Sequence, residues 1–219
     1  MTPTHDPSHP SVLDRLREGN TRFVEGTANR FAAEEAEHRR QLADGQAPDA
    51  VVLTCADSRV PPTLIFDQGL GDLFVIRVAG NVVSPEELGS VEFAVGQLGS
   101  RLVVVLGHTA CGAVTAAVDL LSRPDADISA NLRSITDRIR PAAERAVAQI
   151  RGADAAVSDP LDDDVRAKVV DAAIRLNIEH TAQELRRGSP LLDALCASGE
   201  LEIVGAAYNL RTGTVEVLD

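Results

Sequence analysis

The residues best suited to metal or proton chemistry fall in two short motifs, CADSR (55–59) and HTACG (108–112). Each motif directly follows an apolar run, AVVLT before the first and LVVVLG before the second. Two thiolates and an imidazole form a ligand set suited to zinc, and a site with three protein ligands leaves the fourth tetrahedral position open for water. We therefore interpret Cys55, His108 and Cys111 as a candidate catalytic zinc site.

Two further residues of the first motif bear on that site. The carboxylate of Asp57 could complete the metal shell, or Arg59 could hold it in a bidentate pair and keep it off the metal. Taken singly, each residue also fits an ordinary role, because cysteines after strands are often buried as small apolar residues and an Asp–Arg pair is often a surface ion pair. The coincidence of all these residues after two strands favours the metal site.

The elements that position the motifs are predicted to be strands of a parallel sheet. Runs that are apolar on both faces are typical of parallel strands covered by helices, and the chain has such runs at 50–54, 73–78, 102–107 and 202–208. In an open parallel sheet, ligands bind at the carboxyl ends of the strands. If the strands over 50–54 and 102–107 are neighbours, the two motifs converge on one point.

Helix signals lie between these runs. Ser84, Pro85 and Glu87 form the start of a helix through about residue 98, and Ser189 with Pro190 starts another that Gly199 ends. Longer helices are predicted over 131–150 and 162–187, and an edge strand over 214–218 pairs antiparallel after a turn. We predict an α/β fold, a central mainly parallel sheet with an antiparallel edge strand, flanked by helices.

The amino-terminal part differs from this pattern. Residues 1–10, which contain three prolines, predict a disordered or loosely docked arm. Ser11 can cap a helix through about residue 26, weakened by Gly19 and Asn20, and a polar helix follows at about 32–44. The helices within 11–45 have little apolar surface, so we expect them to pack on another part of the chain or on a partner subunit. Residues 11–219 are predicted to form a single domain.

Composition limits the partners and the compartment. The net charge of −12 disfavours nucleic acid and anionic membranes and suits a small neutral substrate. Three cysteines and a start without a signal-peptide pattern favour a reducing cytoplasm. The uncharged stretch over 102–118 is split by Gly107, His108 and Thr109, which argues against a membrane span.

The two motifs, about 50 residues apart, resemble those of the beta-class carbonic anhydrases, as do GQAPDAVVLT before the first, FDQGLGDLFVIRVAGN between them and GELEIVGAAYNLRTGTVEVL near the end. The resemblance runs from about Ser11 onward. It implies a zinc lyase (carbonate dehydratase) that reversibly hydrates carbon dioxide to bicarbonate and a proton by a zinc-bound hydroxide. It also implies a homodimer or homotetramer in which the amino-terminal helices embrace the neighbour.

The resemblance further implies roles for single residues. Cys55, His108 and Cys111 bind Zn2+, while Asp57 joins the metal only in a closed state and otherwise pairs with Arg59, the two acting as catalytic residues. The implied substrate pocket is formed by Gln46, Phe74, Ala79, Phe93 and Gly112. Ala79 stands where the family often has a larger branched residue, and Phe93 where it often has tyrosine.

Two other readings stay open at this point. The same scaffold and metal could hydrolyse carbonyl sulfide or carbon disulfide, or the chain could be a non-catalytic zinc-binding module whose Asp57 stays on the metal. A thiol redox enzyme is disfavoured because the sequence has no Cys-x-x-Cys motif. Cys196 falls at an apolar helix position and is predicted to be a core residue.

Overall fold

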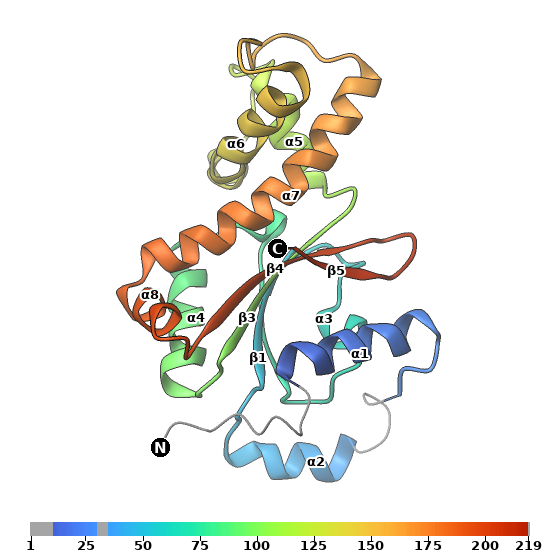
Figure 1. The fold of residues 1–219 in the computed structure, drawn as a ribbon, viewed down its shortest axis with the longest axis vertical. Helices are drawn as coiled ribbons and strands as arrows, with labels where there is room; N and C mark the ends of the chain where they lie inside the picture. The colour runs from blue at the N-terminus through green and yellow to red at the C-terminus, as the bar shows by residue number, and fades with distance from the viewer. Residues whose placement is uncertain (1–10, 30–34, 219) are drawn as a thin grey trace.

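The computed structural model describes residues 11–29 and 35–218, and its central feature is a sheet (Figure 1). Within this part of the chain the sheet has five strands in the order β2-β1-β3-β4-β5. The parallel strands are β1 (Ala50–Thr54), β2 (Leu73–Arg77), β3 (Leu102–His108) and β4 (Glu202–Tyr208), and β5 (Val215–Leu218) pairs antiparallel with β4. The predicted α/β fold with an antiparallel edge strand is confirmed. The predicted arm over residues 1–10 lies outside the described residues.

The two central strands, β1 and β3, are buried along their whole length. Because successive side chains of a strand point to opposite faces, their apolar residues supply both layers of the core. Val51 and Leu53 belong to one apolar cluster, and Ala50 and Val52 belong to the other. This explains why the sequence has continuous apolar runs at these strands.

Five helices pack their apolar side chains into the cluster on the first face. They are α4 (Pro85–Gln97), α5 (Gly112–Leu121), α6 (Ala130–Arg151), α7 (Asp163–Gly188) and α8 (Pro190–Ala197). The predicted capping box at Ser84 is present, and Ser189 caps α8. Within the described residues, no helix is both long and apolar enough to span a membrane.

Helix α7 approaches the sheet closely because two strand positions are glycines. A Cβ atom on Gly107 of β3 would lie 2.5 Å from Ile178 of α7, and a Cβ on Gly205 of β4 would lie 2.8 Å from it. Both contacts are shorter than real side chains allow, so glycine is required for this packing. The middle of α7 is thereby held against β4 and against β3, the strand that ends at the second chemical motif.

The opposite face is covered by α1 (Val12–Val24) and the short α3 (Pro62–Ile65). Leu16 is buried, and a Cβ on Gly19 would lie 1.8 Å from the carbonyl oxygen of Phe66. The side chain of Asn20 donates to Ile65 O and Gly213 O and accepts from the backbone N–H of Val215. Gly19 and Asn20, which locally weaken the helix, are therefore the residues that fasten it to the rest of the chain.

Helix α1 packs on its own chain in this structure, and its contact with a partner subunit stays a prediction. The second predicted helix corresponds to α2 (Glu35–Gln41) and the 3-10 turn Leu42–Asp44 that follows it. Its predicted first residues, 32–34, lie outside the described part of the chain.

Candidate metal centre

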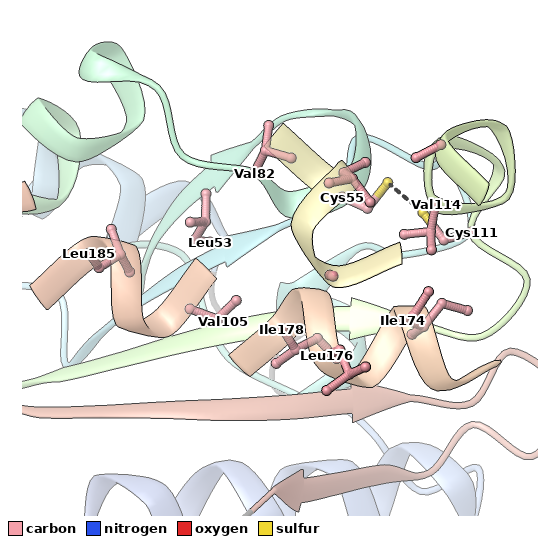
Figure 2. Close-up of a cluster of buried hydrophobic side chains, with 14 of the residues drawn as sticks. Leu53, Cys55, Val82, Val105, Cys111, Val114, Ile174, Leu176, Ile178 and Leu185 are labelled. Carbon is pink, nitrogen blue, oxygen red and sulfur yellow. Dashed lines mark hydrogen bonds between the residues drawn. The ribbon is translucent and has the colours of Figure 1, made fainter. Parts of the chain in front are cut away.

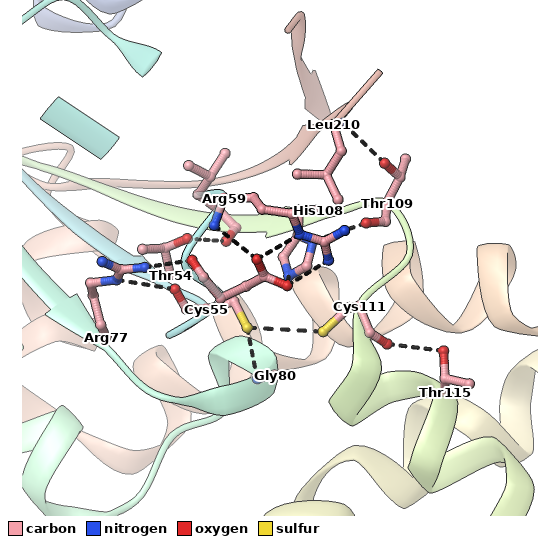
Figure 3. Close-up of polar contacts among 12 residues, drawn as sticks. Thr54, Cys55, Arg59, Arg77, Gly80, His108, Thr109, Cys111, Thr115 and Leu210 are labelled. Atoms are coloured by element: carbon pink, nitrogen blue, oxygen red, sulfur yellow. Dashed lines mark hydrogen bonds and ion pairs between the residues drawn. The ribbon is translucent and has the colours of Figure 1, made fainter. Parts of the chain in front are cut away.

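Strands β1 and β3 are neighbours in register, with Thr54 of β1 opposite Leu106 of β3. The residues that follow them therefore meet at the same edge of the sheet. The ligand atoms of Cys55, His108 and Cys111 all lie within 4.8 Å of one another, and all three residues are buried. Figure 3 shows the two sulfur atoms facing each other beside the imidazole, 4.0 Å apart. The structure thus brings the three predicted ligands together.

The imidazole of His108 is oriented as a metal ligand requires. His108 is the last residue of β3, and its Nδ1 lies 2.9 Å from the carbonyl oxygen of Thr109, so Nδ1 carries the proton and donates it. This leaves a lone pair on Nε2, which is buried and has no hydrogen-bond partner. Buried nitrogen atoms are rarely left unpaired. A divalent metal ion between Nε2 and the two sulfurs would satisfy it.

The two thiol groups are electrostatically coupled. Hydrogen bonding from Cys111 is the largest of the effects that lower the pKa of Cys55 to about 4, with a further contribution from the backbone N–H of Gly80. The hydrogen bond to Cys55, together with burial, raises the pKa of Cys111. The ionisation of one thiol therefore opposes that of the other, and a bound divalent ion would favour the thiolate form of both. This donor set is the one expected for zinc, with a fourth position left for water.

Apolar side chains surround the back of the centre. Cys55 and Cys111 belong to the core cluster of the first face and lie close to Val114 of α5 (Figure 2). Dry surroundings strengthen every electrostatic interaction of the site.

Two backbone turns with left-handed geometry complete the pocket around the sulfurs. After β2, Gly80 (φ 72°) lies in the short turn Ala79–Asn81 and donates its N–H to Cys55 Sγ at 3.3 Å. Between His108 and Cys111, Ala110 has φ 54°, an uncommon conformation for alanine. Because Ala79 directly precedes Gly80 in the first of these turns, it lies beside the centre.

Gly112 directly follows Cys111 and begins α5. No heavy atom outside its immediate neighbours lies within 4 Å of the position its Cβ would take. The surroundings of this position are therefore open.

Asp57 is held by Arg59 in a bidentate ion pair. Arg59 donates from Nε to Oδ1 at 2.9 Å and from Nη2 to Oδ2 at 2.7 Å, and its backbone N–H also donates to Oδ1. The hydrogen bonds from Arg59 are the main reason that the pKa of Asp57 lies well below its usual range. Oδ2 lies 3.9 Å from His108 Nε2, so an ionised carboxylate stands directly beside the metal position.

Sequence reasoning missed Arg77, the last residue of β2. Its guanidinium donates to the carbonyl oxygens of Cys55 at 3.2 Å and Asp57 at 2.6 Å, and so fixes the first motif from the neighbouring strand. The available signal was a single charged residue at the carboxyl end of an otherwise apolar run. It also missed Asn81 and Asn177, which lie behind the centre.

Three predicted pocket residues do not reach the centre of their own chain. Gln46 is exposed and precedes β1, whereas Cys55 follows it, and a strand of this length spans about 16 Å. Phe74 is paired with Val51 near the amino end of β1. The ring of Phe74 lies 6.3 Å from that of Phe93, which is 49% exposed on α4.

An open cavity of about 720 Å³ lies against the outer side of the centre. It is lined by Arg59, Thr109 and Ala110 from the two motif loops and by Arg166 of α7 and Arg211 of the β4–β5 turn. Arg59, which holds Asp57, thus also lines this cavity. Cys196, by contrast, is half-buried on α8 and packs against the core.

Comparison with known proteins gives one consistent family. Residues 50–215 match the sequence family described as carbonic anhydrase. Carbonic anhydrase 2 of Mycobacterium tuberculosis is 38% identical over 205 residues, which cover 93% of this chain and 90% of that protein. The carbonic anhydrase of Mycolicibacterium smegmatis is 37% identical over 202 residues, covering 92% and 89%. The solved structure of Coccomyxa beta-carbonic anhydrase in complex with acetazolamide has a TM-score of 0.69 at 28% identity, covering 98% of this chain and 87% of that one.

Proposed function

Since the chain belongs to the beta-carbonic anhydrase family, we propose that it reversibly hydrates carbon dioxide to bicarbonate and a proton in a zinc-dependent reaction. The observation that carries the proposal is the buried cluster of Cys55, His108 and Cys111, with the unpaired Nε2 of His108 directed at two sulfurs. The chemistry that zinc supplies when bound is a hydroxide nucleophile near neutral pH. Two thiolate ligands neutralise the metal's charge, so we expect activity to favour alkaline pH.

Asp57 is the proposed hydrogen-bond acceptor for the attacking nucleophile. Its Oδ2 stands 3.9 Å from His108 Nε2, and the bidentate pair with Arg59 fixes its direction. Because its pKa is lowered, mainly by the hydrogen bonds from Arg59, the carboxylate stays ionised throughout the working pH range and can accept a hydrogen bond from the nucleophile. In this role Arg59 orients Asp57 and keeps it away from the metal.

The proposed substrate pocket is completed by a second copy of the chain. On its own chain, the centre is bordered by the small residues Ala79 and Gly112, which leave room for a linear, neutral molecule. Gln46, Phe74 and Phe93 lie far from their own chain's centre, so a role for them in substrate binding requires delivery by a neighbour. We therefore propose a homodimer, or a tetramer built from dimers. Light scattering that finds a monomer with full hydration activity would contradict this.

The test of the function combines metal analysis with stopped-flow hydration from about pH 6.5 to about pH 9. We expect one zinc ion per chain and a hydration rate that rises with pH. Full activity without any metal, or bound zinc without hydration at any pH, overturns the proposal. Measuring sulfide release from carbonyl sulfide in the same samples separates a sulfide-releasing hydrolase on this scaffold.

A further inference from the structure

Three buried side-chain atoms lack a hydrogen-bond partner in the part of the chain that the structure describes, and all three lie around the metal centre. They are His108 Nε2, Asn81 Nδ2 and Asn177 Oδ1. A metal ion accounts for the first. The two asparagines do not touch the metal position, so they need a separate explanation, since most buried polar atoms in folded proteins are paired.

Asn177 connects α7 to the turn that supports Cys55. It is fully buried in the middle of α7, and its Nδ2 donates to the carbonyl oxygen of Gly80 at 2.8 Å. Gly80 in turn donates its N–H to Cys55 Sγ at 3.3 Å, as Figure 3 shows. A continuous chain of two hydrogen bonds therefore runs from the core of α7 to one sulfur of the metal centre.

The geometry of Gly80 makes this support necessary. With φ 72°, Gly80 occupies a conformation that glycine adopts freely but leaves just as freely. The close packing of Ile178 on Gly107 fixes the position of Asn177 on α7, and so Asn177 can hold the turn in a single orientation. Within the part of the chain that the structure describes, the Gly80 carbonyl oxygen accepts no other hydrogen bond.

Asn81, the residue after Gly80, lies in the same turn and is the second buried asparagine with an unpaired atom. It is buried, has φ 45°, and its Oδ1 lies 3.5 Å from the position of a Cβ on Gly107, the same position that Ile178 approaches from α7. Its unpaired Nδ2 is a donor, and the unpaired Oδ1 of Asn177 is an acceptor. The two atoms are therefore complementary as hydrogen-bonding groups, and a water that reached both would satisfy them.

We propose that Asn177 is a positioning residue of the metal centre, which acts through Gly80 to keep a backbone N–H on the Cys55 sulfur. This inference rests on the proposed function only in requiring that zinc binds at Cys55, His108 and Cys111. A hydrogen bond to a metal-bound thiolate orients the sulfur and withdraws charge from it. Loss of the bond therefore changes both the affinity for the metal and the electronic state of the metal–sulfur bond.

The experiment compares Asn177→Leu with Thr181→Val as the matched control. Thr181 lies one helical turn further along α7 and is equally buried, and valine has nearly its shape. Zinc affinity is measured by competition with a chromophoric chelator, and the cobalt-substituted proteins are compared by their sulfur-to-cobalt charge-transfer band. For Asn177→Leu we expect a zinc dissociation constant raised about 10–100-fold and a shifted band, and for Thr181→Val a change below about 3-fold and an unshifted band.

Two further variants extend the test. If Asn177→Leu does not fold, Asn177→Ser serves instead, because a hydroxyl and one water can still donate to Gly80 and the expected effect is intermediate. Asn81→Gly keeps the left-handed turn, and its effect combined with Asn177→Leu should be smaller than the sum of the two single effects.

The outcomes that overturn the inference differ from those that overturn the proposed function. Wild-type zinc affinity and an unshifted band in Asn177→Leu overturn it, and so does an equal effect of Thr181→Val, which would indicate general packing of α7. In both cases the wild-type protein still binds zinc and hydrates carbon dioxide. Absence of zinc or hydration in the wild-type protein would instead remove the proposed function.

Discussion

Two buried asparagines hold distant segments of this chain together, and they do so differently. Asn20 joins α1 to the last residue of α3, to the turn before β5 and to the first residue of β5 with three hydrogen bonds, which use both amide hydrogens and the oxygen. Asn177 joins α7 to the turn after β2 with one hydrogen bond and leaves its oxygen unpaired. The first arrangement is complete within the described chain, whereas the second leaves a polar atom that still requires a partner.

The difference separates a purely structural contact, the hydrogen bonds of Asn20 (here called the Asn20 clasp), from the candidate metal site. Around Asn20 the protein satisfies each of the amide's hydrogen-bonding groups, which is the usual state of a buried polar side chain. Around the metal centre it leaves His108 Nε2, Asn81 Nδ2 and Asn177 Oδ1 without partners and holds Ala110 in a left-handed turn. Incomplete pairing of buried polar atoms therefore coincides with the residues that we assign to metal chemistry.

Removal of a metal ligand should give the largest difference between the two regions, because it should affect the metal centre and leave the structure around Asn20 unchanged. In Cys55→Ser and His108→Ala we expect loss of bound zinc and a fall in hydration that exceeds the ~10–100-fold typical of residues behind the ligands. The Asn20 clasp lies on the other face of the sheet, so the far-ultraviolet circular dichroism should stay that of the wild-type protein. Zinc retained at one ion per chain in both variants would contradict the ligand assignment.

Substitution of Asp57 tests whether a residue beside the metal ligands can affect hydration without affecting zinc binding. Asp57→Ala should keep zinc, because the carboxylate is held by Arg59, but should lower hydration by about 10²–10⁴-fold through loss of the group that accepts a hydrogen bond from the nucleophile. Stopped-flow hydration and zinc analysis on the same preparation make the comparison. Wild-type hydration in this variant would remove Asp57 from the mechanism.

Substitution of Asn20 should affect stability and leave the site intact. Asn20→Leu deprives two carbonyl oxygens and one N–H of their partner, and we expect the free energy of unfolding to fall by about 2–4 kcal/mol. Urea denaturation measures the fall, with Thr21→Ala as the control, because the Thr21 hydroxyl bonds only to Arg17 O within its own helix. Zinc affinity and turnover per folded chain should not change, and a tenfold loss of zinc affinity would show that the two regions are coupled.

The sequence predicted those features whose cause is local. The apolar runs predict the strands, and the residues that follow two of them predict the metal cluster, because adjacent parallel strands end at the same edge. Asn20 and Asn177 could not be interpreted in this way. The carbonyl partners of Asn20 lie 45 and 193 residues away, and the Gly80 partner of Asn177 lies 97 residues away. A helix-weakening residue and a polar residue inside a long helix have no local pattern that identifies such partners.

The smallest expected effect concerns Ala110. Its substitution should change the stability of the zinc-free protein and the affinity for zinc in opposite directions. At φ 54°, alanine is disfavoured by about 1–2 kcal/mol, and Ala110→Gly relieves this strain while adding roughly 0.5–1 kcal/mol of unfolded-state entropy. The zinc-free protein should therefore gain between about 0 and about 1.5 kcal/mol of stability in urea denaturation. Zinc affinity should nevertheless fall about 2–5-fold. A glycine turn restricts the position of Cys111 relative to His108 less tightly, so the turn loses more conformational entropy when zinc binds. A variant that is less stable yet binds zinc more tightly would show that the alanine turn does not preorganise the centre.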